Sequence, residues 1–96
     1  MVAMNGTRPD DRLSELVSLE LASLDPYGLR PGAEGGAPAN EYDLEARDIA
    51  TLLRSKPSLS SDDIDRVWYD WFGESLTAKV GRERVTDLLL RLIRLK

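Results

Sequence analysis

The stretch SSDDIDRVWYDWFG, residues 60–73, decides the fold of this chain of 96 residues. Its apolar side chains recur at spacings of three and four residues: Ile64, Val67, Trp68, Trp71 and Phe72. This spacing places them on one face of an α-helix. Ser60 and Asp63 form the pattern of a capping box, and Gly73 favours the left-handed conformation that ends helices. The pattern predicts a helix over residues 61–72. Its stripe of two indoles and a phenyl ring is typical of a core, although such a stripe also suits a ligand platform.

The same periodicity predicts three further helices on either side of this one, over residues 8–24, 41–55 and 77–94. No strand-like alternation competes with them. We therefore expect the all-α class, as a small bundle of about four helices. Gly81 lies inside the last predicted helix, where glycine costs about 1 kcal/mol relative to alanine. It indicates either a close approach by another backbone or a break between two shorter segments.

A segment rich in glycine and proline separates the first two predicted helices. Residues 25–40 hold three of the five prolines and four of the seven glycines, so we expect a long Gly/Pro loop there. A loop of this length is uncommon in a small domain and is usually either functional or disordered. Residues 1–6 are expected to be a frayed leader, and residues 7–96 a single helical domain.

The composition excludes most catalytic chemistry. The chain contains no histidine and no cysteine, which removes thiolate nucleophiles, imidazole bases and the usual zinc sites. Paired carboxylates remain, but they fall at helix starts or on solvated faces. We expect no enzyme, no cofactor and no metal site. No signal peptide or apolar run of about 18 residues is present, so we expect a cytoplasmic protein without a membrane segment.

The net charge of −4 is unevenly distributed along the chain. Residues 74–96 carry six basic and three acidic side chains, a balance of +3, which leaves −7 for residues 1–73. The predicted helices 41–55 and 61–72 have the spacing of a helix-turn-helix. A nucleic-acid-binding regulator that uses the basic C-terminal segment is therefore the alternative function. Acidic residues at the start of the second helix argue against it, because phosphate neutralisation dominates affinity for DNA.

The string DPYGLRPG…GAPANEYDLEARDIATLL, followed by a helix that ends in WFG, resembles a small uncharacterised bacterial family, domain of unknown function 1871. The resemblance covers residues 25–73, and the matching positions are Asp25, Pro26, Gly28, Glu41, Tyr42, Asp43, Phe72 and Gly73. It implies a helical bundle without known catalysis. It lends no substrate, cofactor or mechanism.

The remaining expectation is a protein-binding module that acts through the helix 77–94, the Gly/Pro loop, or both. Apolar side chains of that helix exceed what one core face needs, and arginine and leucine are suitable anchors at interfaces. The candidate interface residues are Leu90, Ile93, Leu95, Arg91, Arg94, Tyr27, Leu29 and Tyr42. The partner is a second copy in a homodimer, or a different protein such as a toxin bound by a small acidic immunity-type or antitoxin-type protein.

Overall fold

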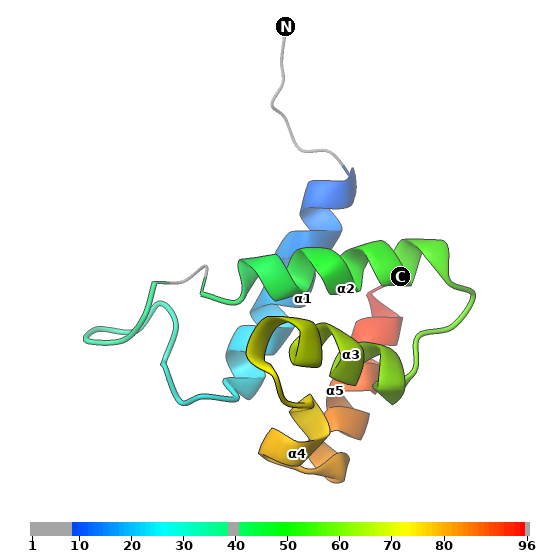
Figure 1. Cartoon of the computed structure of the whole chain (residues 1–96). Helices are drawn as coiled ribbons and strands as arrows, with labels where there is room; N and C mark the ends of the chain where they lie inside the picture. Colours follow the sequence, from blue (N-terminus) through cyan, green and yellow to red (C-terminus); the bar gives the residue numbers. More distant parts are fainter. Residues whose placement is uncertain (1–8, 39–40, 96) are drawn as a thin grey trace, which may run out of the picture.

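Helices and the turns between them account for the whole of the chain that the computed structural model describes, residues 9–38 and 41–95 (Figure 1). The helices are α1 (Pro9–Leu24), α2 (Asp43–Ser55), α3 (Ser61–Phe72), α4 (Leu76–Val80) and α5 (Arg82–Arg94). No strand occurs in this described part, so the predicted all-α class is confirmed. The predicted leader and Arg8, where the first helix was expected to begin, lie outside the described residues.

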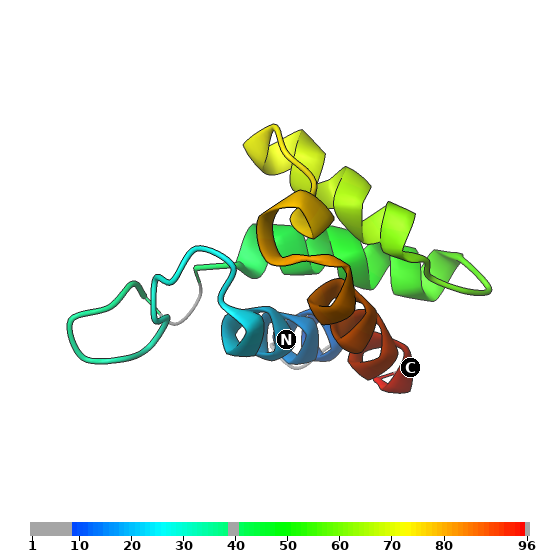
Figure 2. The same cartoon turned by 90° about the horizontal axis from the view of Figure 1, so that it is seen from below.

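The helices pack in a ring of successive contacts. α1 contacts α2 and α5, while α3 contacts α2, α4 and α5. Seen from below, α1 and α5 lie side by side, and α2 lies between α1 and α3 (Figure 2). α4 contacts α5 as well as α3, so every helix has at least two neighbours on which to bury its apolar face.

Trp68 lies in the core that fills this ring. Its side chain is completely buried, and the other core side chains come from all five helices and from the turns before α2 and α3. They are Val17, Leu21, Tyr42, Ala46, Ile49, Ala50, Leu53, Leu59, Ile64, Val67, Leu76, Val85, Leu88 and Leu92. The apolar positions that the periodicity selected on each helix are largely those that the structure buries.

The boundaries of α3 are those predicted from its sequence. Ser60 accepts a hydrogen bond from the backbone N–H of Asp63, and the Asp63 carboxylate accepts one from the backbone N–H of Ser60. Gly73 has φ 75° and ψ 12°, the left-handed conformation that ends a helix at low cost for glycine. Local side-chain chemistry therefore determines both ends of this helix.

The prediction of one helix over residues 77–94 is wrong, and the alternative of a break between two shorter helical segments at Gly81 is confirmed. This glycine has φ 98° and ψ 155°, far from helical values, and it separates α4 from α5. Thr77 explains the change of direction: its backbone N–H and hydroxyl both donate to the Asp65 carboxylate, at 2.8 and 2.7 Å. α4 is therefore tied to α3, and the described residues contain five helices instead of four.

The expected core contribution of Trp71 and Phe72 is also wrong. Their side chains are 45% and 42% exposed, whereas Trp68 is buried. Both lie in the last turn of α3. Phe72 packs on Trp68 and on Tyr27, with ring centroids 5.1 and 5.0 Å apart, but its outer side faces solvent.

Residues 25–38, between α1 and α2, form turns that extend beyond the helices (Figure 1). Two backbone hydrogen bonds close the outer part of this segment, from the N–H of Ala37 to the carbonyl of Leu29 and from the N–H of Gly32 to the carbonyl of Ala37. α2 begins at Asp43, two residues later than predicted, because Glu41 and Tyr42 lie in a turn.

Candidate functional site

Tyr27 is the residue through which the segment after α1 joins the core. Its hydroxyl accepts a hydrogen bond from the indole N–H of Trp68 at 3.1 Å and donates one to Glu74 at 3.0 Å. The two rings stack with centroids 6.5 Å apart, and the Lys79 ammonium lies 4.8 Å from the centroid of the tyrosine ring. Tyr27 therefore belongs to the interior and to the contacts with α3 and α4, with only part of its surface available to a partner.

Asp25 fixes the turn that brings Tyr27 into place. Its carboxylate accepts hydrogen bonds from the backbone N–H groups of Leu29 and Arg30 and from the hydroxyl of Tyr42. Burial would raise the pKa of Asp25, but the hydrogen bonds from Arg30, Leu29 and Tyr42 outweigh it and hold the pKa below its usual value. This arrangement supports a φ of 48° at Asp25, which is rare for a residue other than glycine.

The prediction of Tyr42 as an interface residue is wrong, because its side chain is buried. Its side chain is only 1% exposed, and its ring lies against Trp68 with centroids 6.1 Å apart. Its hydroxyl accepts from the backbone N–H of Tyr27 at 3.4 Å while donating to Asp25 at 3.0 Å. Burial raises its pKa strongly. The phenol connects the start of α2 to the preceding turn and presents no surface to a partner.

Glu45 is a buried carboxylate that the sequence reasoning missed. Its side chain is 4% exposed, and burial together with the charges of Glu41, Asp48 and Asp43 raises its pKa. The signal was present in the spacing, because Glu45 lies three residues after Tyr42 and four before Ile49, on the inner face of α2. The three neighbouring charges that raise its pKa are themselves carboxylates.

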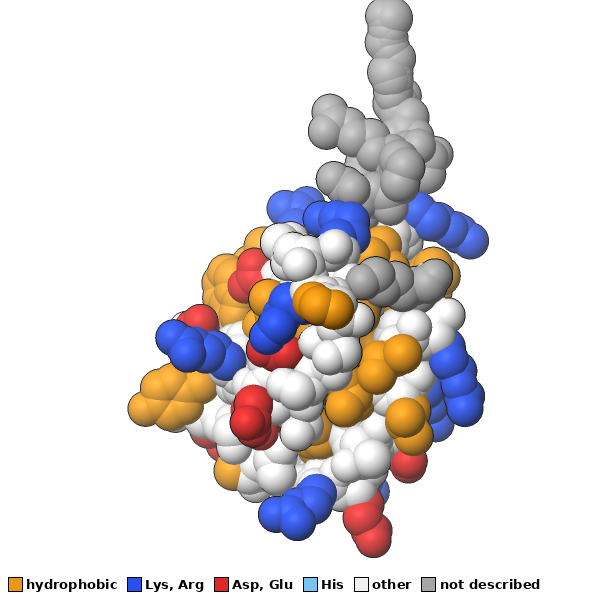
Figure 3. Space-filling model, turned by 90° about the vertical axis from the view of Figure 1, so that its right-hand side faces the viewer, with side chains coloured by type: hydrophobic (Ala, Val, Ile, Leu, Met, Phe, Trp, Pro, Cys, Tyr) orange, Lys and Arg blue, Asp and Glu red, His pale blue; other side chains and the backbone are white. Residues whose placement is uncertain are grey.

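The exposed side of α5 carries most of the candidate interface. Leu90 and Ile93 are 50% and 44% exposed, although the opposite side of the same helix is buried in the core. Arg91 is exposed and lies 3.9 Å from Glu20 of α1, and Arg94 is exposed as well. Leu95 is half-buried and packs against the core. On the side of the molecule that carries the turn between α2 and α3, hydrophobic side chains reach the surface among charged ones (Figure 3).

A small apolar hollow lies beside Ile93. It has a volume of about 70 Å3 and is lined by Leu53, Lys56, Pro57, Ser58, Leu59 and Ile93. The hollow extends the apolar surface of α5 toward the turn between α2 and α3. Leu29, the remaining candidate, is 37% exposed and lies on the segment before α2, so it does not join this surface.

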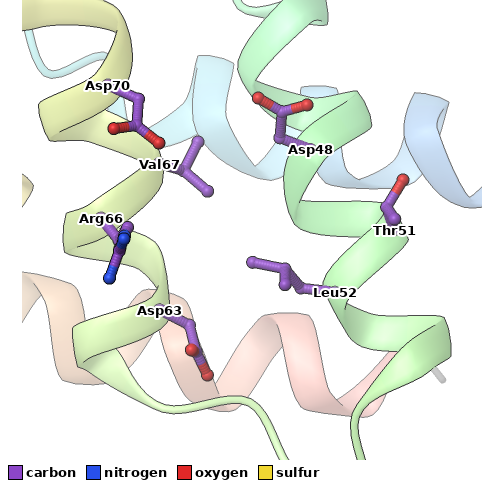
Figure 4. A pocket seen from close by; sticks show the side chains of 7 residues that line it. All are labelled: Asp48, Thr51, Leu52, Asp63, Arg66, Val67 and Asp70. Atoms are coloured by element: carbon purple, nitrogen blue, oxygen red, sulfur yellow. The ribbon is translucent and has the colours of Figure 1, made fainter.

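A larger groove separates the outer sides of α2 and α3 (Figure 4). We call it the α2–α3 groove; its volume is about 350 Å3, and it is lined by Asp48, Thr51, Leu52, Asp63, Arg66, Val67 and Asp70. Leu52 and Val67 form its apolar floor. Trp71 lies at one end, where its indole N–H donates to Asp48 at 2.8 Å. The sequence reasoning did not identify this groove, because it depends on how the two helices pair.

Neither a metal site nor a membrane span is found among residues 9–38 and 41–95. No group of three or more acidic side chains there is placed to hold a metal ion, and no helix is long and apolar enough to cross a bilayer. Comparison of the chain with protein-family models, curated proteins and solved structures gave no match. The resemblance to domain of unknown function 1871 therefore stays a prediction.

Proposed function

We propose that this chain is a non-enzymatic protein-binding module whose principal interface is the exposed side of α5. We define the α5 face as Thr86, Asp87, Leu90, Ile93 and Arg94, which are neighbours at helical spacings of three and four residues. The observation that carries the proposal is the exposure of Leu90 and Ile93 side by side on a helix that is already packed in the core. Adjacent exposed apolar side chains are typical of interaction sites.

A second copy of the chain is the partner that the charges of the α5 face favour. Asp87 lies one turn before Leu90, and Arg94 lies one turn after it. In an antiparallel pair of α5 helices centred on Leu90, Asp87 of one copy comes next to Arg94 of the other, twice by symmetry. The two leucines then meet at the axis, so that apolar and charged contacts form in the same arrangement.

The other functional classes have less support. Catalysis would rest on carboxylates alone, and the charges that raise the pKa of Glu45, the most buried carboxylate among the described residues, are other carboxylates. A helix-turn-helix reader would present α3 to DNA, yet Asp62 and Asp70 are exposed on that helix and would repel phosphates. A toxin-like partner of different sequence would use the same α5 face. We place this activity in the cytoplasm.

Light scattering on the full chain tests the dimer. We expect a mass near twice 10.7 kDa at high micromolar concentration. Leu90→Glu or Ile93→Glu should shift the protein to the monomer, because each buries a charge in the interface. Leu44→Glu is the matched control, since Leu44 is also 50% exposed but lies on α2, and it should leave the mass unchanged.

Charge reversal tests the antiparallel arrangement itself. Asp87→Arg and Arg94→Asp should each weaken the dimer, and the double variant should restore it, because the opposite charges again come together. A monomeric parent protein would reject the homodimer. A shift in the mobility of duplex DNA that depends on Arg82 and Arg84 and weakens with salt would instead favour the nucleic-acid function.

A further inference from the structure

The α2–α3 groove has an acidic end whose two carboxylates form no ion pair within the described residues. The carboxylates of Asp48 and Asp70 lie at the same end, one from each helix (Figure 4). Asp48 uses one oxygen, Oδ2, to accept from Trp71. Within the described residues, its other oxygen and both oxygens of Asp70 have no hydrogen bond or ion pair. This end of the groove therefore attracts a positive charge.

The opposite end of the groove differs, because its carboxylate is already occupied. Asp63 lies 2.6 Å from the ammonium of Lys56 and also bonds to Ser60. These hydrogen bonds, led by that from Lys56, hold the pKa of Asp63 below its usual value. A cationic ligand would therefore be attracted to the end with Asp48 and Asp70 and not to the end where Lys56 already pairs with Asp63.

The middle of the groove suits an aliphatic chain. Leu52 and Val67 project into it from the two helices (Figure 4), and the 45% exposed indole of Trp71 lies next to Asp48. A side chain with an apolar stem and a cationic head matches this order of surfaces. Arginine matches better than lysine, because its planar guanidinium can stack on an indole while it bonds to carboxylates.

We propose that the α2–α3 groove binds an arginine side chain from a basic segment of a partner protein. The stem lies on Leu52 and Val67, and the guanidinium lies between Asp48 and Asp70 beside Trp71. Arg66 also lines the groove and places a like charge near the bound guanidinium. This site does not depend on the α5 face, so it holds whether or not the chain forms a homodimer.

Nuclear magnetic resonance titration of the full chain tests this assignment. The probe is the capped peptide acetyl-Gly-Leu-Arg-Leu-Gly-amide, and the control peptide carries citrulline, a neutral isostere, in place of arginine. The arginine peptide should shift the indole N–H resonance of Trp71 in a saturable way and leave that of the buried Trp68 almost unchanged. Added salt should weaken the binding.

Variants locate the peptide on the protein. Asp48→Asn and Asp70→Asn should each weaken binding about fivefold, the upper range for a solvent-accessible ion pair. Asp62→Asn changes the net charge equally on an exposed part of α3 outside the groove and should have almost no effect. Arg66→Gln should strengthen binding, because it removes the competing charge.

Three results would overturn the proposal. Equal binding of the citrulline peptide would show that the guanidinium is not recognised. An equal effect of Asp62→Asn would reduce the interaction to net charge. If the peptide fails to bind and Asp48→Asn lowers the mass of a dimer, a second copy occupies the groove. Far-ultraviolet circular dichroism of each variant establishes that its fold is intact.

Discussion

Replacing Gly81 by alanine should change the free energy of unfolding in opposite directions, depending on whether residues 77–94 form one continuous helix or two helices separated at Gly81. In a continuous helix over residues 77–94, the substitution would raise the free energy of unfolding by about 1 kcal/mol, because alanine is the better helix former. In the structure, Gly81 has φ 98° and ψ 155°, which a residue with a Cβ rarely adopts. We therefore expect Gly81→Ala to destabilise the protein.

The expected loss of stability in Gly81→Ala comes from backbone strain and not from a steric clash of the new Cβ. Apart from its two chain neighbours, no described residue has an atom within 4 Å of a Cβ placed on Gly81. If the bend is kept, the strain costs about 1–3 kcal/mol. If the chain straightens instead, it must withdraw the buried Leu76, which costs about 1.5–3 kcal/mol, and break the two hydrogen bonds between Thr77 and Asp65. Either outcome destabilises by at least about 1 kcal/mol.

Denaturant unfolding followed by circular dichroism measures this change, and thermal unfolding should show a fall of at least about 4 °C. Thr51→Ala is the control, since Thr51 is exposed within α2, away from the α5 face, and alanine there should stabilise slightly. A gain in stability for Gly81→Ala comparable to that of the control would refute the bend between α4 and α5.

Two further substitutions test the interior. Tyr27→Phe should lower the free energy of unfolding by about 1–3 kcal/mol, because it leaves the buried indole N–H of Trp68 without its acceptor. Tyr69→Phe, at an exposed position, is the control and should change the free energy of unfolding little. Equal effects of the two variants in chemical denaturation would contradict the role of the Tyr27 hydroxyl. Glu45→Gln should stabilise the protein at neutral pH. The folded-state pKa of Glu45 is raised, so the parent protein loses stability as pH rises from the ordinary glutamate pKa of 4.5 through that folded pKa. Unfolding curves from pH 4 to 8 should show this loss in the parent and less of it in the variant.

Local sequence signals were sufficient for α3. The capping box at Ser60 and the left-handed Gly73 act within a few residues, so their effect can be predicted without knowledge of the rest of the chain. Periodicity also identified the buried side of the helix. Periodicity gives the direction of a side chain around the helix axis, but it does not show how far the neighbouring helices extend along that axis. Trp71 and Phe72 lie on the predicted face of α3, but they are partly exposed because they lie in its last turn.

Tertiary contacts determined what the sequence reasoning could not decide. Gly81 is compatible with a costly helical position and with a break, and the hydrogen bonds of Thr77 to Asp65, twelve residues earlier, favour the break. Tyr42 was predicted to be an interface residue, but its side chain is buried and its hydroxyl donates to Asp25. The α2–α3 groove likewise requires two helices to be placed side by side before its lining residues meet.

The aspartates of this acidic chain fall into two groups: those that bond to other groups of the chain, and those that keep oxygens available to a partner. Several carboxylates bind groups of the chain itself: Asp25 holds the turn after α1, Asp43 accepts from Ser18, and Asp65 holds Thr77. Such carboxylates stabilise the fold and offer less to a partner, because their lone pairs are already used. Asp48 and Asp70 differ, since they retain oxygens without such bonds beside an apolar floor. A basic partner attracted by the overall charge would therefore find its most specific contact in the α2–α3 groove, where carboxylates, aliphatic side chains and an indole lie together.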